Sequence, residues 1–242
     1  MEPYGDDIFT EPDADPDGLA NLGPLRPMAG TWESVQGVDD HPTGPGSDMD
    51  GTVIDGGLRN AFVERYELQP IDPQTNGPQL LYGLRYHVHI VKPGEVETFH
   101  DQVGYWLWEA ATRTVAQTIA IPRAQVVLAS GTAEPDATEF ELTATLGSET
   151  YGILSSAFLD AAFHTLSFRI HVTINGDGTW SYVEDTVMKL PDRDELFHHI
   201  DRNTLTRVAA PAPNPLAAPA PPAGVPGGLE IGSLRNERGN LQ

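Results

Sequence analysis

The chain contains no cysteine among its 242 residues. Disulfides, cysteine-based zinc or iron–sulfur sites and thiolate catalysis are therefore excluded, and any metal must be held by histidine and carboxylate side chains. Basic residues are scarce as well, because 14 lysines and arginines stand against 35 aspartates and glutamates and leave a formal net charge of −21. Binding to a phosphate backbone draws its affinity from clustered positive charge, so this balance predicts no nucleic-acid partner.

Long apolar runs are also missing. No stretch of about 18 apolar residues occurs, as a membrane-spanning helix would need. The N-terminal residues are acidic, whereas a signal peptide begins with a basic and then an apolar segment. We therefore expect a soluble, cytoplasmic protein with no membrane partner.

The two ends of the chain differ in composition from its middle. Residues 1–20 carry seven acidic side chains and few large apolar ones, which predicts a disordered acidic arm. Residues 209–242 are rich in alanine and proline and predict a second disordered segment, a tail whose partner, like that of the arm, is unknown. The remaining residues, 21–208, are expected to form one domain.

This middle region has the pattern of an all-β protein. Short polar or glycine-bearing links, such as Asn175-Gly176-Asp177-Gly178, separate segments of alternating hydrophobicity. Segments joined by short links become antiparallel neighbours, so we predict a single up-and-down β-barrel of about ten strands, as in lipocalins and fatty-acid-binding proteins. The predicted strands are residues 31–38, 58–68, 80–91, 97–108, 113–121, 124–133, 138–147, 166–174, 179–190 and 197–208.

The segments between these strands have their own patterns. Residues 19–28 are apolar but interrupted by prolines, which suits a short helical turn that plugs one end of the barrel. Residues 39–57, which include His41, are rich in glycine and proline and are expected to form a loop. Residues 151–164 are expected to form a helical turn or a lid. Because the strands alternate between an apolar and a polar face, the lumen should be apolar. A barrel of about ten strands is wide enough to leave a cavity in it for a small apolar or aromatic ligand.

The last predicted strand departs from this pattern, because neither of its faces is apolar. His199, Asp201 and Asn203 share one face, and His198 lies on the other. We interpret one face as the lining of a polar pocket in which a histidine acts as a ligand or a base, and the pattern leaves open which of the two histidines faces inward. Asp201 and Asn203 are then polar candidates for the cavity. His100 is a further candidate, because it shares a face of its strand with two tryptophans.

A second pair of histidines, His87 and His89, is expected to face water. The residues that alternate with them form a clean apolar row, Tyr82, Leu84, Tyr86, Val88 and Ile90. A competing interpretation is a cupin-like metal site made by His87, His89, Glu95, His199 and Asn203. No catalytic triad or nucleotide fingerprint is present, so catalytic residues stay unknown.

Several motifs resemble one family. Gly30-Thr31-Trp32 follows a turn rich in proline and leucine, and the last strand carries a histidine followed by an aliphatic residue and ends in Leu205-Thr206-Arg207. With the segments 72–78 and 99–106, these motifs resemble the nitrobindin-like, fatty-acid-binding-protein-like haem-binding β-barrels, in particular a bacterial branch of haem-binding β-barrel domains.

This resemblance implies a ligand. In such proteins a histidine on the last strand holds ferric haem b, which binds nitric oxide and converts peroxynitrite to nitrate. In this chain the resemblance implies His199 as the ligand to the haem iron, with His198 as its substitute. The alternative is a haem-free carrier or small enzyme that encloses an apolar metabolite and holds it by hydrogen bonds from His199, His100 or Asp201.

Overall fold

The computed structural model describes residues 11, 13–43, 49–191 and 193–212. Most of the predicted acidic arm and of the predicted tail, residues 1–10, 12 and 213–242, lies outside the described residues. The elements, in chain order, are η1 (Gly23–Met28), β1 (Gly30–Pro42), β2 (Thr52–Ile54), β3 (Gly57–Pro70), β4 (Gln74–Asn76), β5 (Gln79–Val91), β6 (Thr98–Glu109), β7 (Thr114–Ile121), β8 (Gln125–Thr132), β9 (Glu139–Thr145), β10 (Ile153–Ser155), α1 (Ala157–Ala162), β11 (His164–Ile174), β12 (Thr179–Lys189) and β13 (Phe197–Ala209).

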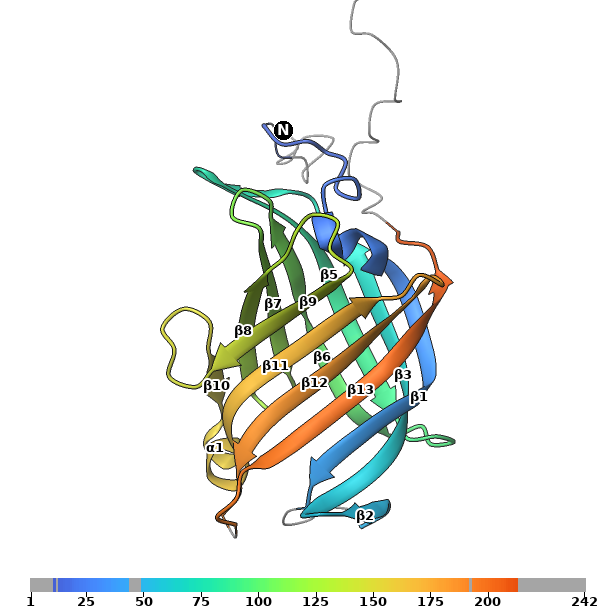
Figure 1. The fold of residues 1–242 in the computed structure, drawn as a ribbon, viewed down its shortest axis with the longest axis vertical. Coiled ribbons are helices and arrows are strands. Elements are labelled where there is room, and N and C mark those ends of the chain that lie inside the picture. Colours follow the sequence, from blue (N-terminus) through green and yellow to red (C-terminus); the bar gives the residue numbers. More distant parts are fainter. Residues whose placement is uncertain (1–10, 12, 44–48, 192, 213–242) are drawn as a thin grey trace, which may run out of the picture.

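The ten strands of seven residues or more form one closed antiparallel barrel (Figure 1). Each of them pairs with the next long strand along the chain, and β13 returns to pair with β1, which closes the barrel. The short strands β2, β4 and β10 extend this sheet at β3, β5 and β8. Short links make sequential strands antiparallel neighbours. The predicted all-β, up-and-down barrel is confirmed.

The predicted loop over residues 39–57 is wrong at both of its ends. β1 continues as far as Pro42, with Asp39 paired to Asn60 of β3 and to Asp201 of β13, and β2 occupies part of the remainder. The sequence pattern did not predict this extension, because two acidic residues followed by glycines and prolines are typical of a loop. Asp40 is tolerated there because the Arg59 guanidinium, on the neighbouring strand, donates to its carboxylate with 2.6 Å between Nη2 and Oδ2.

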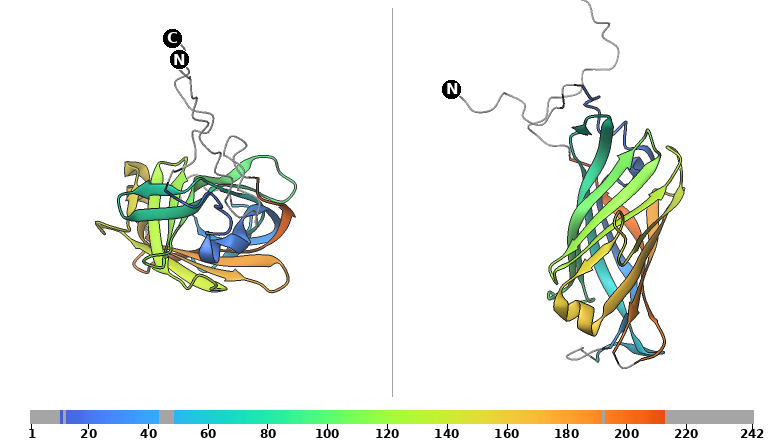
Figure 2. Two further views of the ribbon diagram at one scale, coloured as in Figure 1. Left: turned by 90° about the horizontal axis from the view of Figure 1, so that it is seen from above. Right: turned by 90° about the vertical axis from the view of Figure 1, so that its left-hand side faces the viewer.

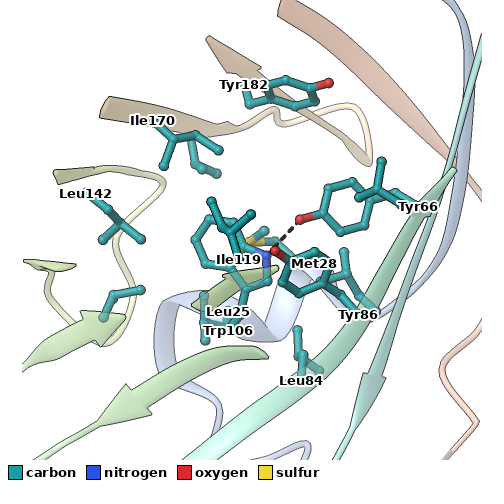
Figure 3. Close-up of a cluster of buried hydrophobic side chains, with 14 of the residues drawn as sticks. Leu25, Met28, Tyr66, Leu84, Tyr86, Trp106, Ile119, Leu142, Ile170 and Tyr182 are labelled. Atoms are coloured by element: carbon teal, nitrogen blue, oxygen red, sulfur yellow. Dashed lines mark hydrogen bonds between the residues drawn. The ribbon is translucent and has the colours of Figure 1, made fainter. Parts of the chain in front are cut away.

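The 3-10 helix η1 plugs one end of the barrel, as the apolar, proline-interrupted segment predicted (Figures 1 and 2). Leu25 and Met28 are fully buried, and the Trp32 indole donates to the Met28 carbonyl at 2.7 Å. Next to the plug, buried side chains fill the lumen (Figure 3). The indole of Trp106 donates to the Tyr66 hydroxyl at 2.9 Å, so this end is a packed core rather than a channel.

The helix α1 lies at the opposite end of the barrel (Figures 1 and 2). It begins at the Ser156 cap, whose hydroxyl accepts a hydrogen bond from the Leu159 amide, and it forms within the segment expected to be a helical turn or lid. In the described part of the chain, no helix is long and apolar enough to span a membrane. With one end packed by η1, the space for a ligand lies toward α1.

Candidate functional site

The barrel encloses a cavity of about 520 Å³ toward the α1 end. Phe158 and Leu159 of α1 contribute to its lining, together with residues from β1, β3, β5, β6, β7, β8, β11, β12 and β13. Small-molecule and cofactor sites are commonly cavities of this size with a few placed polar groups. The cavity is therefore the candidate site.

The cavity has two chemically different walls. Apolar side chains line it from β7, β8 and β11: Ile119, Ile121, Val127, Phe168 and Ile170. Acidic side chains line it from β1, β3, β12 and β13: Asp39, Glu64, Glu184 and Asp201. In the strand order β7 and β8 stand across the barrel from β1 and β13. A bound molecule therefore meets carboxylates on one side and mainly hydrocarbon, together with the amides of Gln117 and Gln125, on the other.

His199 lies on the acidic wall. Its Nε2 atom is 2.8 Å from Asp39 Oδ1 and 3.3 Å from Asp201 Oδ2, and its side chain is 29% exposed. Burial by itself lowers the pKa of an imidazole, but the charges of Asp201 and Asp39 outweigh it and raise the pKa of His199 to about 10. At neutral pH the imidazole is therefore protonated and held between two carboxylates.

Asp201, one of these two carboxylates, belongs to a row that crosses three strands. In the sheet register, Asp201 of β13 stands between Asp39 of β1 and Glu184 of β12. Burial and the neighbouring acidic charges raise the pKa of both Asp201 and Glu184, against the opposing effect of protonated His199. Asp201 and Glu184 can therefore hold a proton closer to neutral pH than a solvated carboxyl group can.

Glu64 is a carboxyl group that the sequence analysis missed. It is 1% exposed, and its Oε2 atom accepts hydrogen bonds from Tyr182 at 2.9 Å and from the Asn203 amide at 2.7 Å. Burial raises the pKa of Glu64 to about 7, although these two bonds oppose the rise. The signal was present in the sequence, because Glu64 alternates in phase with Phe62 and Tyr66, which are apolar and face inward.

The other predicted cavity residues lie in different places. His100 lines the cavity, and its Nε2 is 3.1 Å from Gln102 Oε1; burial lowers the pKa of His100. Asn203 is buried beside the cavity, where its carbonyl oxygen accepts a bond from the Ser34 hydroxyl and its amide group binds Glu64. His41, expected in a loop, lies on β1 and also lines the cavity.

His198 lies on the outer face of the barrel. Its side chain is 57% exposed, and its Nδ1 is 3.0 Å from Asp185 Oδ1. Adjacent strand residues point to opposite faces, so the position of His199 in the cavity wall requires that of His198 outside it. The structure therefore separates the two histidines that the polar pattern left undecided.

Two basic residues, Lys92 and Arg123, also line the cavity. The Arg123 carbonyl accepts a bond from the hydroxyl of Ser156, the residue that caps α1, so Arg123 lies at the α1 end. The Lys92 ammonium lies 5.6 Å from the centre of the Phe99 ring. The lining thus includes cationic groups that can meet an anionic part of a ligand.

The cupin-like alternative is wrong. His87 and His89 point away from the cavity and are 48% and 42% exposed, as the apolar row opposite them predicted, whereas His199 lies inside. The wall of the barrel separates the two groups, so they cannot share a metal ion.

The fold of this barrel is similar to that of a protein of known structure. It is similar to the protein in the crystal structure of Rv2717c from M. tuberculosis, with a TM-score of 0.51 and 18% sequence identity over 79% of this chain and 97% of that chain. At this identity the likeness shows the fold alone. No curated protein matches the chain.

The sequence also matches a family model. The model describes the THAP4-like, heme-binding beta-barrel domain, and it matches residues 21–207, which include all ten long strands except the last residues of β13. The resemblance seen in the sequence motifs is confirmed: the chain belongs to this family of haem-binding β-barrel domains.

Proposed function

We propose that the chain binds haem in the barrel cavity, on the wall that carries His199. The observation that carries this proposal is the position of one imidazole, inside a cavity of about 520 Å³, with a carboxylate 2.8 Å from its ring nitrogen. Metal-bound histidines commonly use a carboxylate to fix the orientation of the ring and to raise its basicity. Asp39 is placed to do this for His199.

The side chains present fit haem in three respects. An imidazole is available on the wall, the opposite wall is apolar and suits the porphyrin ring, and Lys92 and Arg123 can pair with the propionates. One rearrangement is required. An imidazole binds metal in its neutral form, so His199 must give up the proton that it shares with Asp39 and Asp201, and the ring nitrogen that binds the iron must be clear of both carboxylates.

The finer part of the proposal is the reaction. Ferric haem, held by His199, would supply an iron that binds nitric oxide or reacts with peroxynitrite, which is the activity that the resemblance implies. The chain itself provides apolar side chains, including Ile119, Val127 and Phe168, that keep water away from such a ligand. Gln102 and His100, which are bonded to each other and line the cavity, are polar groups that can form hydrogen bonds with such a ligand.

The acidic wall supports a second candidate function. Glu64, Glu184 and Asp201 line the cavity with raised pKa values, and an apolar wall faces them. Carboxyl groups that titrate near neutral pH are suited to proton transfer and to binding a hydroxyl or ammonium group. Without haem, the chain would be a carrier or small enzyme for a ligand with an apolar body and such a polar end.

Titration of the purified, haem-free chain with ferric haem separates the two functions. The haem proposal predicts a Soret band that saturates at one haem per chain, with a ligand-field spectrum typical of histidine coordination. The outcome that overturns it is a spectrum identical to that of free haem at every ratio. The carrier function would then be tested with amphiphilic amines and alcohols as competitors of an environment-sensitive apolar dye.

A further inference from the structure

Two histidines and one aspartate gather on the outer face of the barrel, away from the cavity. His87 and His89 lie on β5 and Asp101 lies on β6. The Nε2 atom of His87 is 2.8 Å from Asp101 Oδ2, and the Nδ1 atom of His89 is 3.5 Å from the same oxygen. One ligand atom from each residue lies within 4.8 Å of the other two. These three side chains are called the outer triad.

The sheet itself brings the outer triad together. Alternation along β5 places His87 and His89 on the same face, and the register between β5 and β6 sets Asp101 directly opposite His89. The two imidazole rings are 6.4 Å apart between centroids. Because the three residues are fixed by backbone pairing in the body of two long strands, their spacing does not depend on a loop.

We propose that the outer triad is a site for a divalent transition metal of the zinc class, separate from the cavity. Two imidazoles and one carboxylate are a common ligand set for Zn²⁺, with bond lengths of about 2.0 to 2.2 Å. Tetrahedral geometry at these lengths separates ligand atoms by about 3.3 Å. The present separations from the Asp101 oxygen, 2.8 and 3.5 Å, are near this value, and the ligand nitrogens of the two histidines lie within 4.8 Å of each other.

Charged groups of both signs surround the outer triad, and Arg85 is exposed on the same face of β5. Burial by itself raises the pKa of Asp101, but its bonds to His87 and His89 outweigh that effect and lower the pKa, so the carboxylate is ionised. On β3, Glu67 stands in register with His87, and Arg65 stands in register with His89. The Arg65 guanidinium is bonded to the carboxylates of Glu67 and Glu33, which offset its charge.

The predicted site has a defined coordination. Three protein ligands leave a fourth position for water, and all three side chains are partly exposed, so metal can enter from solvent. Bound metal would join β5 to β6 and would stabilise the folded chain by mass action, because the unfolded chain does not hold the three ligands together.

Calorimetric titration of the full, chelator-treated, haem-free chain with Zn²⁺ tests this proposal. We expect one equivalent to bind, and we expect the double variant His87→Gln/His89→Gln to lose at least 100-fold in affinity, since two of three ligands are removed. The matched control is His198→Gln, which alters an outer histidine that contacts a single aspartate, Asp185, and which should leave zinc affinity unchanged.

Two further measurements keep the result unambiguous. The melting temperature should rise with Zn²⁺ in the wild-type chain and stay constant in the double variant, and circular dichroism should show that both fold alike. His199→Ala tests whether zinc binds instead at the second group of possible ligands, Asp39, His199 and Asp201. The proposal is overturned if the wild-type chain binds no zinc at about 1 mM, if the double variant binds as well as wild type, or if binding is lost in His199→Ala rather than in the double variant.

Discussion

Nε2 of His199 lies 2.8 Å from Oδ1 of Asp39, although 160 residues separate them in the chain. The contact exists because β1 and β13 are paired where the barrel closes. It places a protonated imidazole against a carboxylate in the wall of the cavity, and the proposed haem site requires that this imidazole lose its proton while Asp39 keeps the ring in place.

Asp39→Asn should lower the pKa of His199 by about one to three units, because it removes a charge and an ionic hydrogen bond that favour the imidazolium form. NMR titration of the histidine ring protons measures this shift directly. Asp185→Asn is the control, since Asp185 contacts His198 on the outer face and its loss should leave the pKa of His199 unchanged. An unshifted pKa of His199 in Asp39→Asn would contradict the electrostatic account of the site.

Glu64 predicts a pH dependence of stability. Its pKa is about 7 in the folded protein and 4.5 as a solvated side chain, so the unfolded chain ionises first as the pH rises. The stability contributed by protonated Glu64 is complete below about pH 4.5 and is lost as the pH rises through 7, by about 3 kcal/mol in total. Glu64→Gln does not titrate, and the difference in free energy of unfolding between variant and wild type should therefore grow in favour of the variant over this range.

Denaturant unfolding at about pH 4 and about pH 8 tests this prediction. The glutamine side chain keeps an oxygen that can accept bonds from Tyr182 and Asn203, so the folded structure should be preserved. If the stability of the variant relative to wild type is the same at both pH values, the pKa of Glu64 is not raised by folding, and the prediction is wrong.

The contact between the plug and the barrel can be tested at Gly23. Its φ angle is +54°, and a Cβ atom there would lie 2.5 Å from the indole ring of Trp108. Gly23→Ala should therefore cost roughly 2 to 4 kcal/mol, from backbone strain together with overpacking. Gly77→Ala is the matched control, because Gly77 has a φ of +59° but no atom within 4 Å of the position that a Cβ would take, and it should lose about 1 kcal/mol through backbone strain alone. Equal losses, measured by denaturant unfolding, would mean that the plug is not packed against Trp108.

The barrel could be predicted from sequence because alternation and short links are local signals. The residues of the functional sites could not be assigned from these local signals alone. His198 and His199 had to face opposite sides of β13, but neither side is apolar, so the choice between them depended on the pairing of His199 with Thr186 and on the position of β13 in the closed barrel. The Asp39 contact was hidden for a similar reason, since β1 shifts register between Ser34 and Gly37 and continues through residues that favour a loop.

The outer triad could likewise be predicted only in part from the sequence. Alternation predicted that His87 and His89 face solvent, and this is what the structure shows. The third member, Asp101, is identified by the cross-strand register between β5 and β6, which is a property of the folded sheet. Sequence patterns thus assign residues to faces, and strand register assigns them to sites.

The measurement that tests the haem proposal most directly compares two single variants, His199→Ala and His198→Ala, in a spectroscopic titration with ferric haem. We predict that His199→Ala lowers haem affinity by at least tenfold and shifts the Soret band, because the imidazole in the cavity wall is lost. His198→Ala removes a neighbouring imidazole that lies outside the barrel, and its spectrum and affinity should match those of wild type. Equal haem binding by wild type and His199→Ala, or loss of binding in His198→Ala alone, would contradict the assignment of His199 as the ligand.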